Sequence, residues 1–519
     1  MKETVLKILL DHGTLIEPDA SDYILSQKDP VSFIKDYLKD RESIPLILTL
    51  EDIRTTGSVL DFEEEEVPDQ EMPKDPEPEQ PESKKASQIQ LEGPDEAAPR
   101  MLGVEAGDGV HIIRDITGTS TCDGSIENFT NYFRDRYRIL RRIIRSHVEM
   151  SGSVPIKKVQ YLERDAKIIG MVVDVQKTKN GHLGVTVEDD SGELFVLFHK
   201  DSELFQAMER ENDAVLKDEV IGIVGRVTSN SRPGGGRSVM FIPSAIHRPK
   251  MALNKQLRKT DKDIEVAFLS DIHVGSSHFL PEAWERFMEW IKGPEASKLK
   301  YMVIAGDLVD GIGVYPNQED ELIITDIYKQ YEELARLMEP IPKHIKIIMQ
   351  PGNHDAVRPA EPQPAISEKL QSFFGENVVH VGNPCYFSIE GVEILAYHGR
   401  SIDDLVGGIP GVEYHEPVRP MQEMLKRRHL AITYGEKTPL APEVKDYMVI
   451  NPVPDIFVTG HVHRTAVHRM SGLTMINASA WQSQTPFQKM HNFHPDPAKV
   501  VISNLRTGRC RILDFLEEK

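Results

Sequence analysis

Short apolar runs, each followed by polar residues, recur through the C-terminal half of the chain. Five of them have the length and the β-branched composition of buried strands; they span residues 266–269, 301–304, 345–349, 392–396 and 456–458. Asp, Asn or His stands a few residues beyond the end of each run. In open α/β sheets, ligands gather at the edge where strands end and loops begin. The pattern therefore predicts that residues 263–519 form a domain in which polar side chains from several strands meet.

A different pattern occupies residues 155–250, where strand-like runs alternate with turn signals. The runs, with one helical segment at 202–211, are 168–175, 184–188, 194–198, 220–228 and 239–242. Five strands with a helix between the third and the fourth is the layout of an OB-fold β-barrel. Such a barrel binds either nucleic acid or another protein. The loop that contains Arg232 and Arg237 is basic and glycine-rich, as a loop that grips a nucleic-acid strand would be.

Helical spacing precedes the barrel, in residues 106–154. Apolar residues three and four apart form one stripe from Ile126 to Val148, and Ser125 stands at the N-cap position. The rest of this helix surface is rich in arginine, at Arg134, Arg138, Arg141, Arg142 and Arg145. Such a basic face is either solvated or in contact with nucleic-acid phosphates or an acidic partner.

The first hundred residues divide into two parts of different composition. Residues 1–52 show helical spacing and predict a small helical domain, for which docking to a partner is one interpretation. Residues 53–105 form an acidic, proline-rich linker, in which the stretch 61–96 holds 14 acidic and 3 basic residues and so a net charge of −11 out of −21. A segment with so little to bury cannot offset its ordering entropy, so we expect the linker to be disordered.

Composition excludes several classes of protein. Three cysteines are too few and too scattered for a disulfide framework or a Cys-type zinc site. Apolar runs fall short of the ~18 residues that a membrane span requires, and the N-terminus lacks a signal-peptide pattern. We therefore expect a cytoplasmic, multidomain α+β protein without membrane contact.

The polar residues at the strand ends are of the kinds that bind divalent metals. They are Asp271, His273, Asp307, Asn353, His398, His461 and His463. Asp307 follows a glycine and could bridge two cations about 3.5–4 Å apart. Asp271 and His273 are two positions apart on a segment that we expect to be extended, so their side chains should point the same way. Mixed oxygen and nitrogen ligands favour Mn²⁺, our first choice, with Fe, Zn²⁺ or Mg²⁺ as alternatives.

Three further residues are candidates for contact with a phosphoryl group. His354 stands beside Asn353 and is not needed as a ligand, so it could protonate a leaving oxygen. Arg358 and Arg400 lie close in sequence to ligands and could contact phosphate, although either could equally be a surface arginine.

Four motifs occur in order along the domain: Asp-x-His, Gly-Asp, Gly-Asn-His and Gly-His-x-His. This pattern resembles the calcineurin-like metallophosphoesterase superfamily, which includes phosphatases and the double-strand-break repair nuclease. The resemblance implies an αββα sandwich with His354 as the catalytic histidine. It also implies one metal held by Asp271, His273, Asp307 and His463, and another held by Asp307, Asn353, His398 and His461.

Longer motifs narrow the resemblance. Segments 306–318 (GDLVDGIGVYPNQ), 352–364 (GNHDAVRPAEPQP), 427–435 (RRHLAITYG), 454–463 (PDIFVTGHVH) and 481–488 (WQSQTPFQ) are similar to the small subunits of archaeal family-D DNA polymerases. This resemblance implies a 3′→5′ exonuclease that proofreads single-stranded or mismatched 3′ DNA ends for a large polymerising subunit. The alternatives are a phosphatase or cyclic-nucleotide phosphodiesterase and a non-catalytic scaffold. The barrel argues against the first alternative, and the intact ligand set argues against the second.

Overall fold

The computed structural model describes most of the chain beyond residue 108, namely 109–159, 161–162, 165–231, 237–249, 251, 255–490 and 492–516. Before that it describes 5, 15–16, 23–24, 29–39, 47–48 and 104–105. The chain divides into two units, Met1–Pro94 and Asp95–Lys519. In the first unit, helix α3 (Pro30–Lys39) accompanies a parallel pair, β1 (Leu15–Ile16) with β2 (Ile47–Leu48). The predicted helical domain thus also contains strands, and the predicted linker lies almost entirely outside the described residues.

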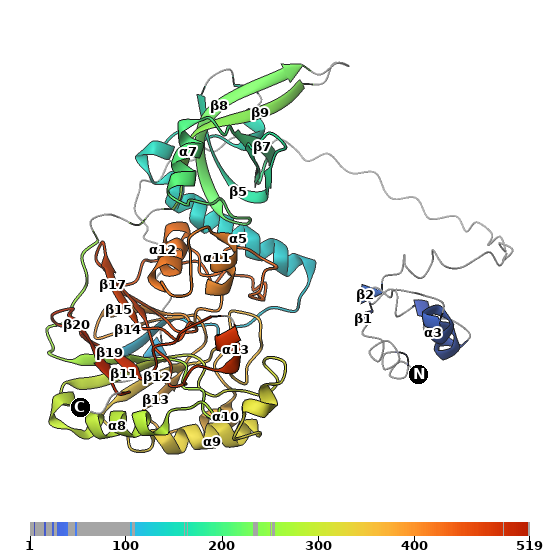
Figure 1. Cartoon of the computed structure of the whole chain (residues 1–519). Coiled ribbons are helices and arrows are strands. Elements are labelled where there is room, and N and C mark those ends of the chain that lie inside the picture. Colours follow the sequence, from blue (N-terminus) through green and yellow to red (C-terminus); the bar gives the residue numbers. More distant parts are fainter. Residues whose placement is uncertain are drawn as a thin grey trace, which may run out of the picture. The chain divides into compact units, whose positions relative to one another are not determined.

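Two sheets form the larger part of the second unit (Figure 1). The first, in spatial order, is β13 (Val378–His380), β12 (Lys346–Gln350), β11 (Leu299–Ala305), β10 (Glu265–Leu269), β19 (Lys499–Asn504) and β20 (Cys510–Asp514). The second is β17 (Ala466–Met470), β18 (Leu473–Asn477), β16 (Ile456–Thr459), β15 (Val392–Ala396), β14 (Cys385–Ile389), β4 (Val110–Arg114) and β3 (Val104–Glu105). Strands β10 to β13 run parallel to one another, as do β15, β16 and β18.

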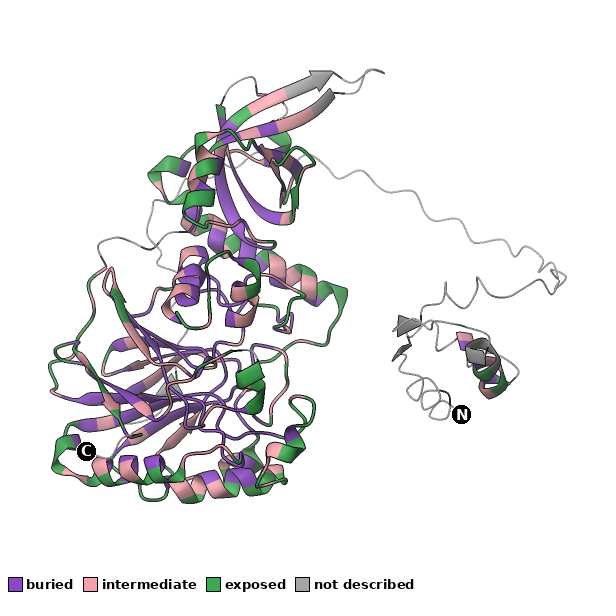
Figure 2. Ribbon diagram, in the orientation of Figure 1, coloured by how far each residue is buried: buried purple, intermediate pink, exposed green. Residues whose placement is uncertain are grey.

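Alternation along the strands creates the layers. In β10, Val266 and Phe268 face the apolar core between the two sheets, whereas Ala267 and Leu269 face the helices outside. Helices α8 (Pro281–Lys292) and α9 (Ile327–Met338) cover the first sheet, and α11 (Ile402–Gly408) and α12 (Val418–Arg427) cover the second. The result is a helix–sheet–sheet–helix sandwich with its buried residues in the middle (Figure 2).

The five strand-like runs predicted from the sequence are confirmed as β10, β11, β12, β15 and β16. The sequence predicts that residues 106–154 and residues 263–519 belong to different domains, but the structure joins the two segments in one sheet. Strand β4 lies in the first of these segments, yet it pairs with β14 and extends the second sheet. A five-residue strand of this kind is fixed by its distant partner, so its own sequence gives little sign of it.

Several other helical segments are short. They are α6 (Ile156–Val159), α10 (Glu368–Gln371), α13 (Pro486–Met490) and three turns of 3₁₀ helix at Val148–Met150, Pro294–Ala296 and Gln318–Glu321. None of the helices in the described part of the chain is long and apolar enough to cross a membrane.

A closed barrel of five strands forms the rest of the second unit. Its members are β5 (Asp165–Lys177), β6 (Leu183–Asp189), β7 (Gly192–Phe198), β8 (Val220–Ser231) and β9 (Arg237–His247), paired in the order β5-β6-β7-β9-β8. Helix α7 (Glu203–Arg210) separates the third strand from the fourth, as the sequence predicts. Of the two loop arginines, Arg232 lies outside the described residues, and Arg237 is described only as the first residue of β9.

Helix α5 (Ile126–Arg145) packs against the barrel. Ser125 caps it as predicted, because its side chain accepts a hydrogen bond from the backbone N–H of Asn128. The predicted apolar stripe is wrong at both ends, where Ile126 and Val148 are each 86% exposed. Val148 belongs to a 3₁₀ turn that follows the helix. The true buried face includes a residue that the stripe omits, Arg136.

The guanidinium of Arg136 joins three parts of the unit. It forms an ion pair with Asp446, with 2.8 Å between Nε and Oδ2, and donates to the carbonyl of Ile432 at 2.7 Å. It also donates to the carbonyl of Asp218, just before β8, and to the hydroxyl of Tyr132. Asp218 belongs to the barrel, whereas Ile432 and Asp446 follow α12 in the sandwich. Arg136 therefore fixes the helix to both.

Arg136→Ala should lower the free energy of unfolding by about 3–5 kcal/mol, because it removes the guanidinium from the buried carboxylate of Asp446 and leaves it only the contact with His429 among the described residues. Denaturant titration followed by tryptophan fluorescence measures the change. The matched control is Arg138→Ala on the same helix, since the Arg138 side chain is 72% exposed and pairs with the nearby Asp135. Because water screens the exposed guanidinium, we expect this pair to contribute ~0–1 kcal/mol. Equal losses in the two variants would show that the buried network does not hold the unit together.

Candidate metal centre

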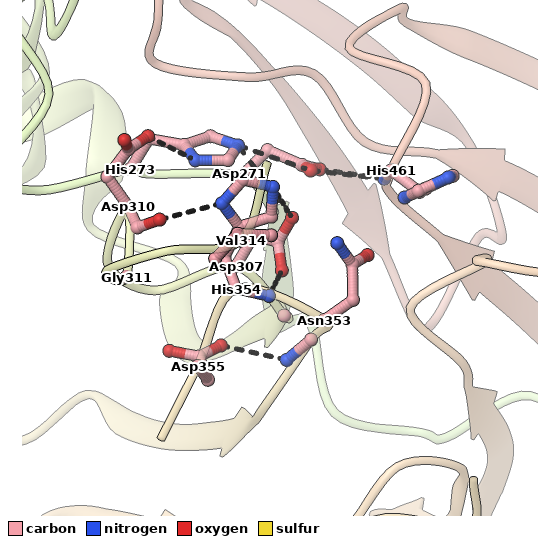
Figure 3. A network of polar contacts seen from close by, with 12 residues as sticks. Asp271, His273, Asp307, Asp310, Gly311, Val314, Asn353, His354, Asp355 and His461 are labelled. Atoms are coloured by element: carbon pink, nitrogen blue, oxygen red, sulfur yellow. Dashed lines mark hydrogen bonds and ion pairs between the residues drawn. The ribbon is translucent and has the colours of Figure 1, made fainter. Parts of the chain in front are cut away.

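The side chains predicted to bind metal converge where strands of both sheets end. Figure 3 shows five of them, Asp271, His273, Asp307, Asn353 and His461. In chain order, Asp271 and His273 follow β10, Asp307 follows β11, Asn353 follows β12, His398 follows β15, and His461 and His463 follow β16. These are the carboxyl ends of parallel strands in each sheet. The structure therefore brings together the residues that the strand-end pattern selects.

The backbone at these positions is unusual. The φ angles are positive at five of the seven residues: Asp271 (51°), His273 (53°), Asp307 (49°), His461 (69°) and His463 (49°). Residues other than glycine rarely adopt this left-handed conformation, which costs on the order of 1–3 kcal/mol each. The expectation that Asp271 and His273 lie on an extended segment is therefore wrong, and a turn directs both side chains inward. Strain of this kind clusters at functional sites.

Two glycines allow the strand-end loops to approach one another. Gly306 has a φ angle of 97°, and a Cβ atom there would collide with the ring of His398. A Cβ atom on Gly352 would overlap the carboxylate of Asp307. Each glycine is therefore required by space, and Gly306 also by its backbone conformation.

Asp271, His273 and His463 form one group of potential ligands. The Nε2 atoms of the two histidines are 3.1 Å apart, and Oδ1 of Asp271 lies 3.4 Å from Nε2 of His463 and 3.9 Å from Nε2 of His273. Atoms that ligate one cation at ~2.1 Å lie about 3 Å apart at adjacent corners of the coordination sphere. The spacing of this group therefore fits a single divalent ion.

A second group surrounds Asp307. Its Oδ2 atom is 3.2 Å from Nε2 of His398, and the same Nε2 is 3.0 Å from Oδ1 of Asn353. His461 offers a ligand atom within 4.8 Å of those of Asp307 and His398. Oδ2 of Asp307 is also 3.8 Å from Nε2 of His273, which belongs to the first group. Asp307 thus lies between the two groups, where a bridging carboxylate would have to be.

Hydrogen bonds from outside the groups orient two of the histidines. Nδ1 of His398 donates to the carbonyl of Ala305 at 2.9 Å, and Nδ1 of His273 is 3.0 Å from Oδ1 of Asp310. In both rings Nε2 is left to face the carboxylates. This arrangement, in which a second partner fixes the ring and its tautomer, is general among metal-binding histidines.

The charges in the site are strongly coupled. Asp307 is 2% exposed, and although burial opposes its ionisation, His398 and His354 outweigh that effect and hold its pKa well below the usual value. Burial likewise opposes protonation of His398 and His273, but Asp307 raises the pKa of His398 to about 10. The hydrogen bond to Asp310 and the charge of Asp307 raise the pKa of His273 to about 9. The site requires positive charge, which protonated imidazoles or metal cations can supply.

His354 lies between the groups but is held differently. Its backbone N–H donates to Oδ1 of Asp307 at 2.9 Å, and its Nδ1 donates to the carbonyl of Asp310 at 2.7 Å. Nε2 of its ring faces Oδ2 of Asp307 at 3.9 Å. Burial lowers the pKa of His354. His354 is thus oriented with Nε2 toward Asp307.

The structure adds two acidic residues that the sequence analysis missed. Asp310 contacts His273 and accepts a hydrogen bond from Nε2 of Gln482 at 3.1 Å. Oδ2 of Asp403 lies 3.3 Å from Nε2 of His461. Asp310 is in the segment 306–318 that carries the family resemblance, so its spacing from Asp307 was an available signal. Asp403 lies at the start of α11, and no local motif distinguishes it.

The arginines proposed as phosphate contacts are engaged elsewhere. Nη2 of Arg358 forms an ion pair with Glu443 at 2.8 Å, and Nη1 of Arg400 donates to the carbonyl of Pro359. Neither is among the described residues that line the cavity over the candidate ligands. Their contact with phosphate stays a prediction, and their hydrogen bonds within the protein favour a structural role.

A cavity of about 430 Å³ opens over the two groups. Its polar wall contains His273, Asp307, His354, His461 and His463. Its other walls include Lys437 and four aromatic residues, Tyr315, Tyr414, Phe487 and Phe493. The volume is within the ~300–1,000 Å³ range of sites that bind small molecules.

The donor set fits divalent metal ions. Two imidazole nitrogens only 3.1 Å apart, on His273 and His463, must share either a proton or a cation. Carboxylate, amide and imidazole ligands together are those that Mn²⁺, Fe or Zn²⁺ prefer. The donors form overlapping groups, Asp271/His273/His463, His273/Asp307/His354 and Asp307/His398/His461, which share the carboxylate of Asp307 or the ring of His273 and have the composition of a two-metal site.

Comparison with known proteins agrees with the motifs. Residues 266–468 match a family described as the B subunits of DNA polymerases alpha and epsilon. The chain is 45% identical over 400 residues to the DNA polymerase II small subunit of Archaeoglobus fulgidus. The aligned region covers 75% of this chain and 78% of that protein. The chain is also 40% identical over 441 residues to the DNA polymerase II small subunit of Methanothermobacter thermautotrophicus, with 82% and 88% covered.

Among solved structures, the chain is similar to one described as a novel archaeal phosphodiesterase, with 12% identity and a TM-score of 0.26. That match covers 48% of this chain and 99% of the other, and it carries no weight at this TM-score. The identity and coverage of the polymerase subunits are decisive. The chain belongs to the family of archaeal DNA polymerase II small subunits.

Proposed function

We propose that the chain is the 3′→5′ exonuclease subunit of an archaeal family-D DNA polymerase, and that it hydrolyses terminal DNA phosphodiesters with two metal ions. The observation that supports this most directly is the buried position of Asp307 between two groups of histidine and oxygen donors. Membership of a polymerase small-subunit family makes DNA the expected substrate and a large polymerising subunit the expected partner.

We assign the helix–sheet–sheet–helix sandwich to the calcineurin-like metallophosphoesterases and the barrel to the OB folds. The strand order and the helix between the third and fourth strands support the second assignment. A barrel of this class is suited to single-stranded DNA, because its strands and loops form a surface for backbone and bases. Small phosphomonoesters need no such surface, which favours a nuclease over a phosphatase.

We assign one metal to Asp271, His273, Asp307 and His463, and the other to Asp307, Asn353, His398 and His461, with Mn²⁺ as the first choice. When bound, the two cations supply the Lewis acidity that activates water and holds the charge of the phosphoryl oxygens. Asp310 and Asp403 then act as positioning residues, because each holds a ligating imidazole from outside.

His354 is assigned to the chemistry itself. Its Nδ1 proton is committed to the carbonyl of Asp310, so Nε2 is the atom that can exchange a proton with substrate. The negative charge of a bound phosphodiester favours protonation at Nε2. His354 can then donate that proton to the leaving 3′ oxygen.

Asp307→Ala should abolish hydrolysis of DNA and lower the bound Mn²⁺ by more than one ion per chain, because it removes a ligand from both groups. Asp271→Ala should lower it by about one. Metal analysis after equilibrium dialysis measures both, with Asp320→Ala, an exposed acidic residue nearby, as the control for loss of charge. Two ions retained in Asp307→Ala would rule out the bridge.

His354→Ala should keep both ions and still bind DNA, while hydrolysing it at least ~10²-fold more slowly, the usual effect of losing a general acid. Single-turnover digestion of a labelled strand, together with metal analysis, tests this. Loss of an ion in the same variant would make His354 a ligand instead.

The proposed substrate preference predicts a difference between primer ends. With the large subunit present, a mismatched 3′ end should be digested faster than a matched one, because unpairing a matched end costs free energy that a mismatch has already released. Digestion of 3′- and 5′-labelled primer–templates measures both polarity and preference. Equal rates of digestion for the matched and the mismatched 3′ end, together with fast turnover of a small phosphomonoester, would favour a phosphatase.

A further inference from the structure

The cavity over the candidate ligands has a second wall, which is formed by aromatic residues. Phe487, on α13, is 50% exposed although it lines the cavity. Its ring centroid is 5.9 Å from that of Tyr315, and the two planes are inclined by 32°. Tyr315 is fixed in turn by a hydrogen bond from its hydroxyl to Glu321 at 3.2 Å. The rings of Tyr315 and Phe487 together form an aromatic wall.

The aromatic wall is close to the proposed chemistry. The centroid of Tyr315 lies 6.3 Å from that of His354, whose Nε2 faces Asp307. The loop that carries Val314, the neighbour of Tyr315, passes beside His354 and Asp310 in Figure 3. If a molecule bound with its phosphoryl group at Asp307, the chemical group next to that phosphoryl would therefore lie along these rings.

The neighbouring surface favours an apolar, planar occupant. The segments that carry the aromatic wall also expose Ile312 (42%), Val314 (38%) and Met490 (78%). A bare sugar–phosphate chain gains little from such a surface, whereas every nucleobase has an apolar face that can stack on it. Exposed apolar surface that continues into a polar cavity is typical of ligand-binding grooves.

We propose that Phe487 and Tyr315 stack on the unpaired terminal nucleobase of the DNA strand whose phosphodiester lies at Asp307. This proposal rests on the proposed nuclease function and adds a base-binding subsite to it. A terminal base that is still paired leaves only its outer face free for such stacking, whereas an unpaired base can turn either face to the rings. The aromatic wall would thus select unpaired ends of any sequence, because stacking depends little on which base is present.

The subsite is tested by binding, which does not depend on hydrolysis. The probes are two trinucleotides with a phosphorothioate at the terminal linkage, one with a normal 3′ base and one with a reduced abasic residue in its place. The full chain, loaded with Mn²⁺, should bind the first about 5- to 150-fold more tightly, the effect of one base–aromatic stack. Phe487→Ala should lower this ratio, because only the ring of Tyr315 is then left to stack, and Phe487→Tyr should restore it.

The matched control is Tyr161→Ala, which removes an aromatic ring that is 75% exposed and does not line the cavity. It should keep the wild-type ratio. A wild-type ratio near one, or a ratio unchanged in Phe487→Ala, would overturn the base-binding subsite. Digestion of the unmodified trinucleotides tests the nuclease function separately. A chain that prefers the base-bearing probe but hydrolyses neither substrate would retain the subsite and refute the exonuclease.

Discussion

The burial of two carboxylates at the strand ends is the constraint on which the rest of the site depends. Asp271 and Asp307 are 0% and 2% exposed, and an isolated buried carboxylate is strongly unfavourable. The neighbouring rings of His273 and His398 offset that cost, because the carboxylates raise the pKa values of these histidines and so favour their positive charge. Bound metal cations would offset it more completely. The left-handed turns and the close glycine contacts serve the same purpose, because they bring donors from two sheets to one place.

The sandwich and the barrel are organised around this centre in different ways. Parallel strands with alternating faces place the ligand loops at one edge, so the layers fix the metal groups directly. The barrel is connected through α5, where Arg136 reaches Asp218 on one side and Asp446 on the other. This buried junction holds α5 to both the barrel and the sandwich.

Local sequence was sufficient to bring the candidate ligands together at one edge but not to describe their geometry. Each candidate follows a short apolar run, so the strands and the edge where these side chains meet could be predicted. The left-handed turn at Asp271 and His273 could not, because it is imposed by contact with neighbouring loops. Burial of Arg136 was missed for a similar reason, since charge usually indicates an exposed position and its partners are distant in the chain. The aromatic wall comes from segments far apart in sequence, 315 and 487, and only the fold brings them together.

Anomalous diffraction tests most directly whether two metals share Asp307. Crystals grown with Mn²⁺ should show two anomalous peaks about 3.5–4 Å apart, one on each side of the Asp307 carboxylate. One peak should adjoin His273 and His463, and the other should adjoin Asn353 and His398. A single peak, or a pair of peaks without Asp307 between them, would contradict the account.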